Sequence, residues 1–173
     1  MEKLSDEQLA RLVQASGDAG SYAELVRRHQ APLLAFLYRL AGNDMNVDDI
    51  SQTAIFQAYR KIRQFRFKST FRTWLFKIAY LEYLQLLRHR KVVDRLKSNL
   101  TALQSEPASV DVDLSMDLQK AMLMLSEQER AAILLCDAHG FSHSEAAQAM
   151  NAPLGSVKTY VQRARKKMRE LLI

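Results

Sequence analysis

The chain has 173 residues, of which 25 are Lys or Arg and 19 are Asp or Glu, giving a formal net charge of +6. This length suits one domain or two small ones, and the positive balance favours acidic partners such as nucleic acid. The single cysteine, Cys136, excludes an intramolecular disulfide framework and a Cys-based zinc site. No stretch approaches the roughly eighteen apolar residues of a membrane span, and the polar residues 1–10 are not typical of a signal peptide. We therefore expect a cytoplasmic protein with a reduced thiol.

The apolar residues recur with helical periods, and strand signals are weak, so an all-α fold is predicted. Ser5 fits the N-cap of a first helix, and residues 16–21, SGDAGS, read as a loop. A helix resumes over 22–30, after which Pro32 can start the next helix or break a longer one. Gly42 is placed as the C-terminal cap of that segment.

A third helix is expected after Asn46, which can cap it, with Asp48 and Asp49 in the first turn, where negative charge is favoured. A fourth helix starts near Ser69 or Thr70 and runs into the basic residues 88–91. The third helix has an apolar stripe with a step of four residues, formed by Ile50, Ala54, Ala58 and Ile62.

Cations and aromatic residues alternate between Tyr59 and Lys77. This combination suits single-stranded nucleic acid, because cations follow phosphates while aromatic faces stack on unpaired bases. The alternative is that the aromatic side chains form the core. Phe65 and Phe67 fall in the expected loop before the fourth helix, so they are the better candidates for base contact.

Residues 96–115 are rich in Ser and acidic side chains and read as a flexible acidic linker. The net charge is +6 over residues 1–95, −2 over 96–115 and +2 over 116–173. The sequence therefore predicts two small basic helical domains, 1–95 and 116–173, on either side of this linker.

The second domain carries a helix-turn-helix pattern. Ser126 and Ser142 each begin a capping box, and residues 151–155, with Pro153 and Gly155, form the break before a last helix. From 158 to 169 this helix has six Lys or Arg and no acidic residue. A solvated basic face near a helix C-terminus is the alternative, but the capped preceding helix favours a reading helix in the DNA major groove.

These features resemble the extracytoplasmic-function (ECF) group of bacterial sigma factors. The segment LSEQERAAILLCDAHGFSHSEAAQAMNAPLGSVKTYVQRARKKMREL is similar to the fourth conserved region of that family, and VDDISQTAIFQAYRKI and FKSTFRTWLFKIA are similar to parts of the second. The resemblance implies a protein without enzymatic activity or cofactor. It implies binding to core RNA polymerase, through the β′ clamp helices and the β flap, and to promoter DNA. Many relatives are also held by an anti-sigma factor.

The resemblance assigns three groups of residues. Core polymerase contact is expected from Asp48, Asp49, Gln52 and Thr53. Binding and melting of the minus-ten element is expected from Arg63, Phe65, Arg66, Phe67, Lys68, Ser69, Thr70, Arg72, Trp74 and Lys77. Contact with the minus-thirty-five element is expected from Ser156, Lys158, Thr159, Tyr160, Gln162, Arg163, Arg165 and Lys166, with Arg163 as base reader and Arg165 and Lys166 on phosphates.

The chain departs from the family pattern at Thr53, at Tyr80-Leu81, at Gln85 and at Tyr160. The change at Tyr80-Leu81 predicts an unusual minus-ten preference. A helix-turn-helix regulator that binds duplex DNA without polymerase is the alternative function, although it leaves FRTWL unexplained. Catalysis is disfavoured, because His139 and His143 are separated by Gly140 and no glycine-rich phosphate loop is present.

Overall fold

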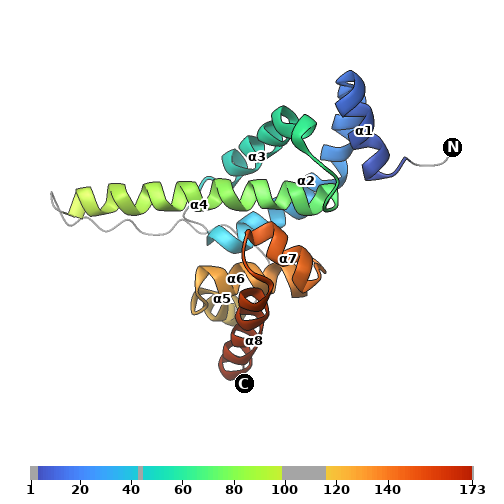
Figure 1. Cartoon of the computed structure of the whole chain (residues 1–173). Helices are drawn as coiled ribbons and strands as arrows, with labels where there is room; N and C mark the ends of the chain where they lie inside the picture. Colours follow the sequence, from blue (N-terminus) through green and yellow to red (C-terminus); the bar gives the residue numbers. More distant parts are fainter. Residues whose placement is uncertain (1–3, 43–44, 99–115, 173) are drawn as a thin grey trace.

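The computed structural model describes residues 4–42, 45–98 and 116–172, and over these residues it contains helices and no strand. The prediction of an all-α fold is confirmed. We call residues 4–98 the N-terminal half and residues 116–172 the C-terminal half (Figure 1). The elements are α1 (Asp6–Ser16), α2 (Ala19–Ala41), α3 (Val47–Lys61), η2 (Ile62–Gln64), α4 (Phe71–Ser98), α5 (Met116–Leu123), α6 (Glu127–Ile133), the π-helical η3 (Leu134–Ala138), α7 (His143–Met150) and α8 (Leu154–Leu171).

Most helix starts follow the local signals in the sequence. Ser5, Ser126 and Ser142 each accept a hydrogen bond from the backbone N–H three residues on, and each is reached in return by the side chain at that position. Asn46 accepts from the N–H of Asp49, and Gly42 ends α2 with φ 64°. These caps satisfy N–H groups that a helix end leaves unpaired, which is why the boundaries could be predicted.

Two boundaries in the first forty residues were predicted wrongly. The expected loop over 16–21 is reduced to two residues, because Gly17 (φ 70°) ends α1 and Asp18 already caps α2 by accepting from the N–H of Ser21 at 2.9 Å. The chain also does not break at Pro32, which lies inside α2. A proline in a helix interior costs about 3 kcal/mol or more. The apolar residues that follow it, such as Leu33 and Phe36, are both fully buried and outweigh that cost.

Helix α4 is longer than expected. Its 28 residues reach Ser98 and correspond to a length of about 42 Å. Residues 96–98, predicted as the start of the linker, are therefore helical, and the rest of the predicted linker lies outside the described residues. The last turns of α4 project beyond the other helices (Figure 1).

In the C-terminal half the chain changes from one helical type to another directly after α6. Residues 134–138 form a π-helical segment, and Gly140 (φ 70°) makes the turn into α7. Asn151 (φ 51°) ends α7 in the left-handed region. Gly155 lies in the first turn of α8 rather than in the break.

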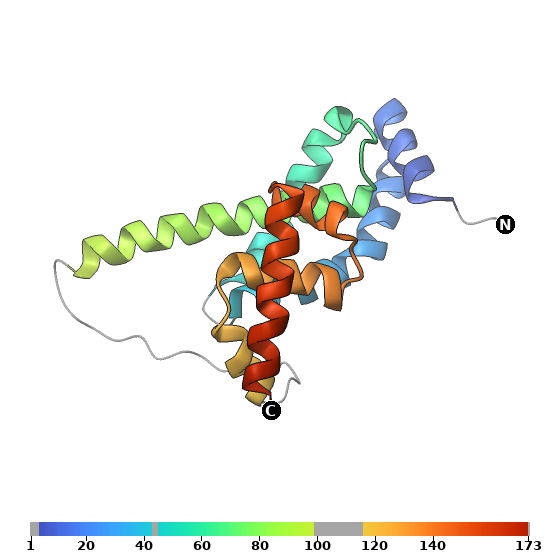
Figure 2. The same cartoon turned by 60° about the horizontal axis from the view of Figure 1, so that its bottom comes forward.

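The two halves pack against each other. The C-terminal half lies on one side of α4 and α3 on the other, as the two views show (Figures 1 and 2). The ring of Phe76, from α4, lies 5.3 Å from that of Phe36 in α2 and 5.1 Å from that of Phe141, before α7. A single cluster of buried apolar residues therefore runs through both halves.

Candidate nucleic-acid and protein interfaces

The first candidate site is a cleft of about 640 Å³ beside the start of α4. Cations and Trp74 line one wall, and the helix-turn-helix lines the other. The lining residues contain no carboxylate, so the cleft is cationic. They are Gln64, Phe65, Arg66, Lys68, Ser69, Thr73, Trp74 and Lys77 from the N-terminal half, and Ser144, Ala147, Gln148, Asn151, Ala152 and Pro153 from the C-terminal half.

The aromatic residues of the loop before α4 form a packed cluster rather than a free stacking surface. Phe65 is only 5% exposed, and its ring lies 4.6 Å from that of Phe67 and 4.9 Å from that of Trp74. The guanidinium of Arg11 covers Phe67 at 4.1 Å. Phe65, expected to be free for base contact, is therefore largely packed into the protein, and the half-buried Trp74 is the more exposed of the two aromatic side chains that line the cleft.

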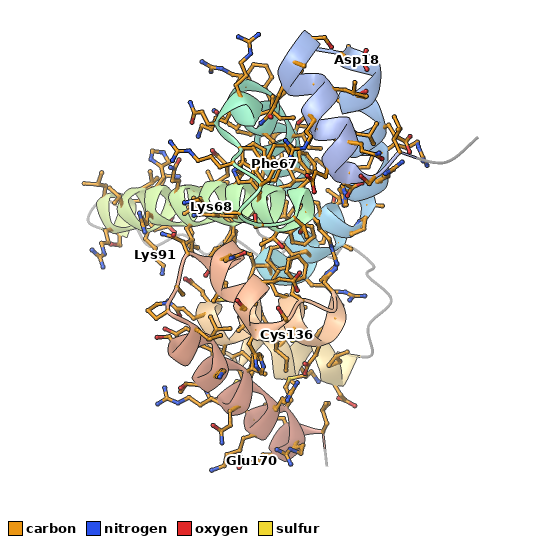
Figure 3. The ribbon with its side chains drawn as sticks, turned by 45° about the vertical axis from the view of Figure 1, so that its right-hand side comes forward. Asp18, Phe67, Lys68, Lys91, Cys136 and Glu170 are labelled. Atoms are coloured by element: carbon orange, nitrogen blue, oxygen red, sulfur yellow. The ribbon has the colours of Figure 1, made fainter. Side chains whose placement is uncertain are left out.

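The backbone of this loop is held in place by a side chain from α1. The amide of Gln14 donates to the carbonyl oxygens of Ile62 at 2.7 Å and Phe65 at 2.8 Å. Thr70 Oγ1 accepts from the N–H of Thr73 at 3.1 Å and so caps α4. The loop therefore presents Arg63, Arg66 and Lys68 as exposed cations from a fixed backbone. Figure 3 shows Phe67 and Lys68 in this loop, over the ribbon of α4.

Arg72 was predicted among the minus-ten residues, but the structure places it between the two halves. Its Nη2 donates to the carbonyl oxygen of His139 at 2.6 Å, and its guanidinium lies 4.4 Å from the centre of the Phe141 ring. Burial lowers the pKa of Arg72, and the nearby carboxylate of Glu145 opposes that shift. In this arrangement the guanidinium of Arg72 is occupied by protein groups.

The second candidate site is the exposed side of α3. Asp48, Asp49, Gln52 and Thr53 are all exposed there, as a docking role requires. The hydroxyl of Tyr38 donates to Asp48 at 2.9 Å. The structure thus brings the four residues predicted for polymerase contact together on one helix.

An apolar groove of about 420 Å³ adjoins these residues. Phe56 is 59% exposed and Tyr59 is 40% exposed, which is unusual for large apolar side chains. Phe56 was not among the residues predicted from sequence, although its position off the buried stripe of α3 is a signal for an exposed apolar side chain. The groove is lined by Ala19, Tyr22, Ala23, Gln52, Ile55, Phe56 and Tyr59.

The third candidate site is the outer face of α8. Val157, Val161 and Ala164 are buried and hold α8 against the rest of the C-terminal half. The opposite face is open to solvent, and Ser156 and Tyr160 at its edges are half-buried. The exposed residues predicted for the minus-thirty-five element are Lys158, Thr159, Gln162, Arg163, Arg165 and Lys166.

Arg165 differs from its neighbours, because it is engaged within the protein. Its Nη2 and Nε donate to the two carboxylate oxygens of Asp137 at 2.7 and 3.0 Å. These bonds hold the pKa of Asp137 below its usual range and raise that of Arg165. Arg165 thus ties α8 to η3, whereas no ion pair is found for Arg163 among the described residues.

Nothing in the described part of the chain points to metal chemistry or to a membrane span. No group of three or more His, Cys, Asp or Glu side chains there could hold a metal ion. None of the described helices is long and apolar enough to cross a membrane. Cys136 is half-buried and burial raises its pKa, which suits a structural thiol.

Comparisons with known proteins agree with this arrangement. Residues 25–92 match the family model for sigma-70 region 2, and residues 115–168 match that for sigma-70 region 4. The chain is 31% identical to the ECF RNA polymerase sigma factor SigE of Mycolicibacterium smegmatis, over 91% of this chain and 65% of that protein. It is 30% identical to the ECF RNA polymerase sigma-E factor of Escherichia coli, over 95% of this chain and 92% of that protein.

A solved structure has the same fold. The sigma factor RpoE from Bartonella quintana, crystallised with the anti-sigma factor NepR, superposes with a TM-score of 0.76 at 28% identity, covering 89% of this chain and 98% of that one. The matched regions coincide with the helices that carry the three candidate sites, α3 and α4 in region 2 and α7 and α8 in region 4. The chain therefore belongs to the ECF group of sigma-70-type RNA polymerase sigma factors.

Proposed function

We propose that this sigma factor divides promoter recognition between its halves while α3 docks it on core RNA polymerase. A sigma factor directs core RNA polymerase to specific promoters and starts transcription there. The observation that carries the division of roles is the separation of the three sites. A cationic cleft lined by Trp74, a docking face with an apolar groove and a basic reading helix lie on different surfaces of one chain.

The cleft beside α4 is the proposed site for the minus-ten element. Arg66, Lys68 and Lys77 supply positive charge for the phosphates of a melted strand, and Trp74 supplies a ring for an unpaired base. Tyr80, which replaces a family residue, is buried at 3% exposure, whereas Leu81 is 37% exposed. Both positions depart from the family pattern, so the base preference of this site is expected to be unusual.

The exposed side of α3 is the proposed docking site for the β′ clamp helices of the polymerase. Asp48 and Asp49 provide negative charge, and the groove around Phe56 provides apolar area to bury. Aromatic side chains in such grooves often carry much of the binding energy. Thr53 departs from the family pattern, so we expect the apolar groove around Phe56 to carry a larger share of the docking energy here.

Helix α8 is the proposed reader of the minus-thirty-five element. Arg163 is exposed and free of an ion pair in the described structure, so its guanidinium is available for a base edge. Lys158 and Lys166 are placed to hold phosphates. Arg165 has a different role here, because its bidentate pair with Asp137 positions the helix.

We expect no catalytic activity and no cofactor, and action in the cytoplasm, where RNA polymerase works. An anti-sigma factor is a further proposed partner. The Bartonella relative was solved with NepR bound. This chain exposes apolar side chains that a protein of that kind would cover. Leu123, the last residue of α5, and Met124, which follows it, are 68% and 65% exposed.

The function is tested by gel filtration of the chain with core RNA polymerase. The wild type should co-elute, Phe56→Asp should not, and Arg163→Ala should co-elute while losing promoter selectivity. Tight, sequence-specific binding of duplex DNA by the free chain, without co-elution, would instead support the polymerase-independent regulator.

A further inference from the structure

We propose that helix α1 positions the minus-ten loop, residues 65–70, and that Gln14 is the side chain that does so. This inference rests on the proposed minus-ten role of that loop. It gives a function to a helix that lies outside residues 25–92, the segment matched by sigma-70 region 2. Gln14 itself need not touch the DNA, because it acts through the backbone that carries Arg66 and Lys68.

Helix α1 is itself fixed to the body of the N-terminal half. Its inner face is buried through Leu9, Ala10 and Val13. In its first turn, Asp6 Oδ1 accepts from Arg28 Nη1 of α2 at 2.9 Å. Helix α1 also contacts η2 and α4, the elements on either side of the minus-ten loop. It is therefore a fixed support, from which side chains on another face can hold a neighbouring segment.

The side chain of Gln14 joins α1 to the turn that leads into the minus-ten loop. Its amide nitrogen carries two N–H groups, and it donates to the carbonyl oxygens of Ile62 at 2.7 Å and Phe65 at 2.8 Å. The carbonyl oxygen of Ile62 also accepts from the N–H of Phe65 at 3.1 Å, which closes η2. Gln14 is half-buried, and hydrogen bonds sheltered from water are stronger than exposed ones. One side chain therefore fixes both ends of this turn.

The backbone of Phe67 shows that the loop needs such support. Its φ is 56°, in the left-handed region that a residue with a Cβ adopts only at an energetic cost. Its ring is held from two sides, by the guanidinium of Arg11 at 4.1 Å and by the ring of Phe65 at 4.6 Å. Arg11 is held in turn by Glu7, through bonds of 2.7 and 3.1 Å to one carboxylate oxygen. Glu7, Arg11 and Gln14 are spaced by four and three residues, so one face of α1 supports the loop.

This support determines how the loop presents its cations. Arg66 and Lys68 flank Phe67 in sequence and are exposed, whereas Phe67 is half-buried and in contact with α1. Both cations line the cleft together with Trp74, whose ring lies 4.9 Å from that of Phe65. A loop whose cations are already in place binds a strand without the cost of ordering them. Loss of the two bonds from α1 should therefore weaken the capture of single-stranded DNA.

Two variants of Gln14 and one matched control separate positioning from general stability. Gln14→Met keeps a side chain of similar length and helix propensity but has no N–H donor, so both bonds are lost. Gln14→Asn keeps the amide on a side chain one methylene shorter, and serves if the first variant does not fold. Asp18→Ala is the control, because it removes a side-chain bond to the backbone of Ser21 in the same half of the chain. Figure 3 shows Asp18 away from Phe67 of the loop.

Hydrogen exchange of the free chain reports the loop directly. In Gln14→Met the amides of residues 65–70 should exchange about tenfold faster than in the wild type, while those of α2 keep their rates. The single tryptophan, Trp74, gives a second signal, because its ring stacks on Phe65. Its emission should move to longer wavelength as the loop loosens. Asp18→Ala should leave both signals unchanged, even though it lowers the melting temperature.

Holoenzyme binding to a labelled promoter fragment whose minus-ten element is unpaired by mismatches completes the test. Gln14→Met should bind it about tenfold more weakly than the wild type, with unchanged affinity for a duplex that carries only the minus-thirty-five element. Unchanged exchange in residues 65–70, unchanged affinity for the unpaired fragment, or an equal loss in Asp18→Ala would each overturn the positioning role. A wild-type holoenzyme that does not form, or that does not prefer the unpaired fragment, would count against the proposed function instead.

Discussion

Arg163 and Arg165 lie two residues apart on α8, and the structure predicts that they have different roles. Both are exposed cations on the proposed reading helix. Arg165 is held by Asp137 through two hydrogen bonds, at 2.7 and 3.0 Å, whereas Arg163 has no ion pair among the described residues. We therefore expect Arg163→Ala to change sequence recognition and Arg165→Ala to change mainly the stability of the C-terminal half.

The magnitudes of the two effects differ. A bidentate contact between an arginine and a guanine edge gives about 1–3 kcal/mol of discrimination, which corresponds to about 5- to 150-fold in affinity. The side chains of Arg165 and Asp137 are 51% and 39% exposed, and a pair so accessible to solvent contributes about 1 kcal/mol or less. Arg165→Ala should therefore lower the melting temperature by no more than about 4 °C.

The assay titrates the holoenzyme onto a fluorescently labelled promoter fragment and follows the anisotropy of that fragment. The sequence of the fragment is chosen beforehand by selection with the wild-type holoenzyme. A second fragment with a permuted minus-thirty-five element is the control. Arg163→Ala should weaken binding to the selected fragment and leave binding to the permuted one nearly unchanged. Equal losses on both fragments would show that Arg163 holds a phosphate. A loss of discrimination in Arg165→Ala would refute the assignment of that residue to positioning.

Three further predictions follow from other parts of the chain. Phe56→Ser should weaken co-elution with core polymerase while leaving the melting temperature unchanged, because 59% of this side chain is exposed; a lower melting temperature would mean that Phe56 supports the fold. Burial, together with the positive charges of Arg72 and Arg39, lowers the pKa of His139 to about 4. The packing of this imidazole against Phe36 and Phe76 should therefore be most stable above about pH 6.5 and weaken as the pH falls towards 4, and His139→Gln should remove this pH dependence of the melting temperature. Arg88 and Arg95 are exposed on the projecting end of α4. If they contact upstream duplex, Arg88→Ala with Arg95→Ala should make the salt dependence of holoenzyme binding shallower by about two phosphate contacts, and an unchanged slope would exclude that contact.

The parts of the fold that were predicted from sequence are those fixed by residues close together in the chain. Ser126, Ser142 and Asn46 cap their helices through bonds that span three residues. The apolar stripe of Val157, Val161 and Ala164 is likewise buried as its spacing predicts. Such features depend little on the rest of the molecule, so pattern and propensity are sufficient to find them.

The misplaced features depend on contacts that are distant in sequence. Pro32 remains helical because residues on both sides of it are buried against other helices. Phe65 was expected at a nucleic-acid surface because it lies in a loop, yet the loop folds back and packs its ring against Trp74. A local pattern of aromatic and basic residues cannot distinguish a stacking surface from a small core, because both need the same residue types.

The packing of the two halves against each other is likewise a feature that local sequence patterns do not predict. Phe76 and Phe141 each occupy an apolar position that any helical domain would bury within itself, so the sequence pattern points to two separate cores. In the structure these rings instead join the halves, and the cation above them, Arg72, comes from the segment assigned to DNA. The guanidinium of Arg72 is engaged by His139 and Phe141, so a local pattern of cations does not show which of them are free for DNA. Arg130 and Lys91 are likewise bonded between the halves, to the carbonyl oxygen of Leu40 and to the carboxylate of Glu127. These partners are distant in sequence, so no local pattern could predict them.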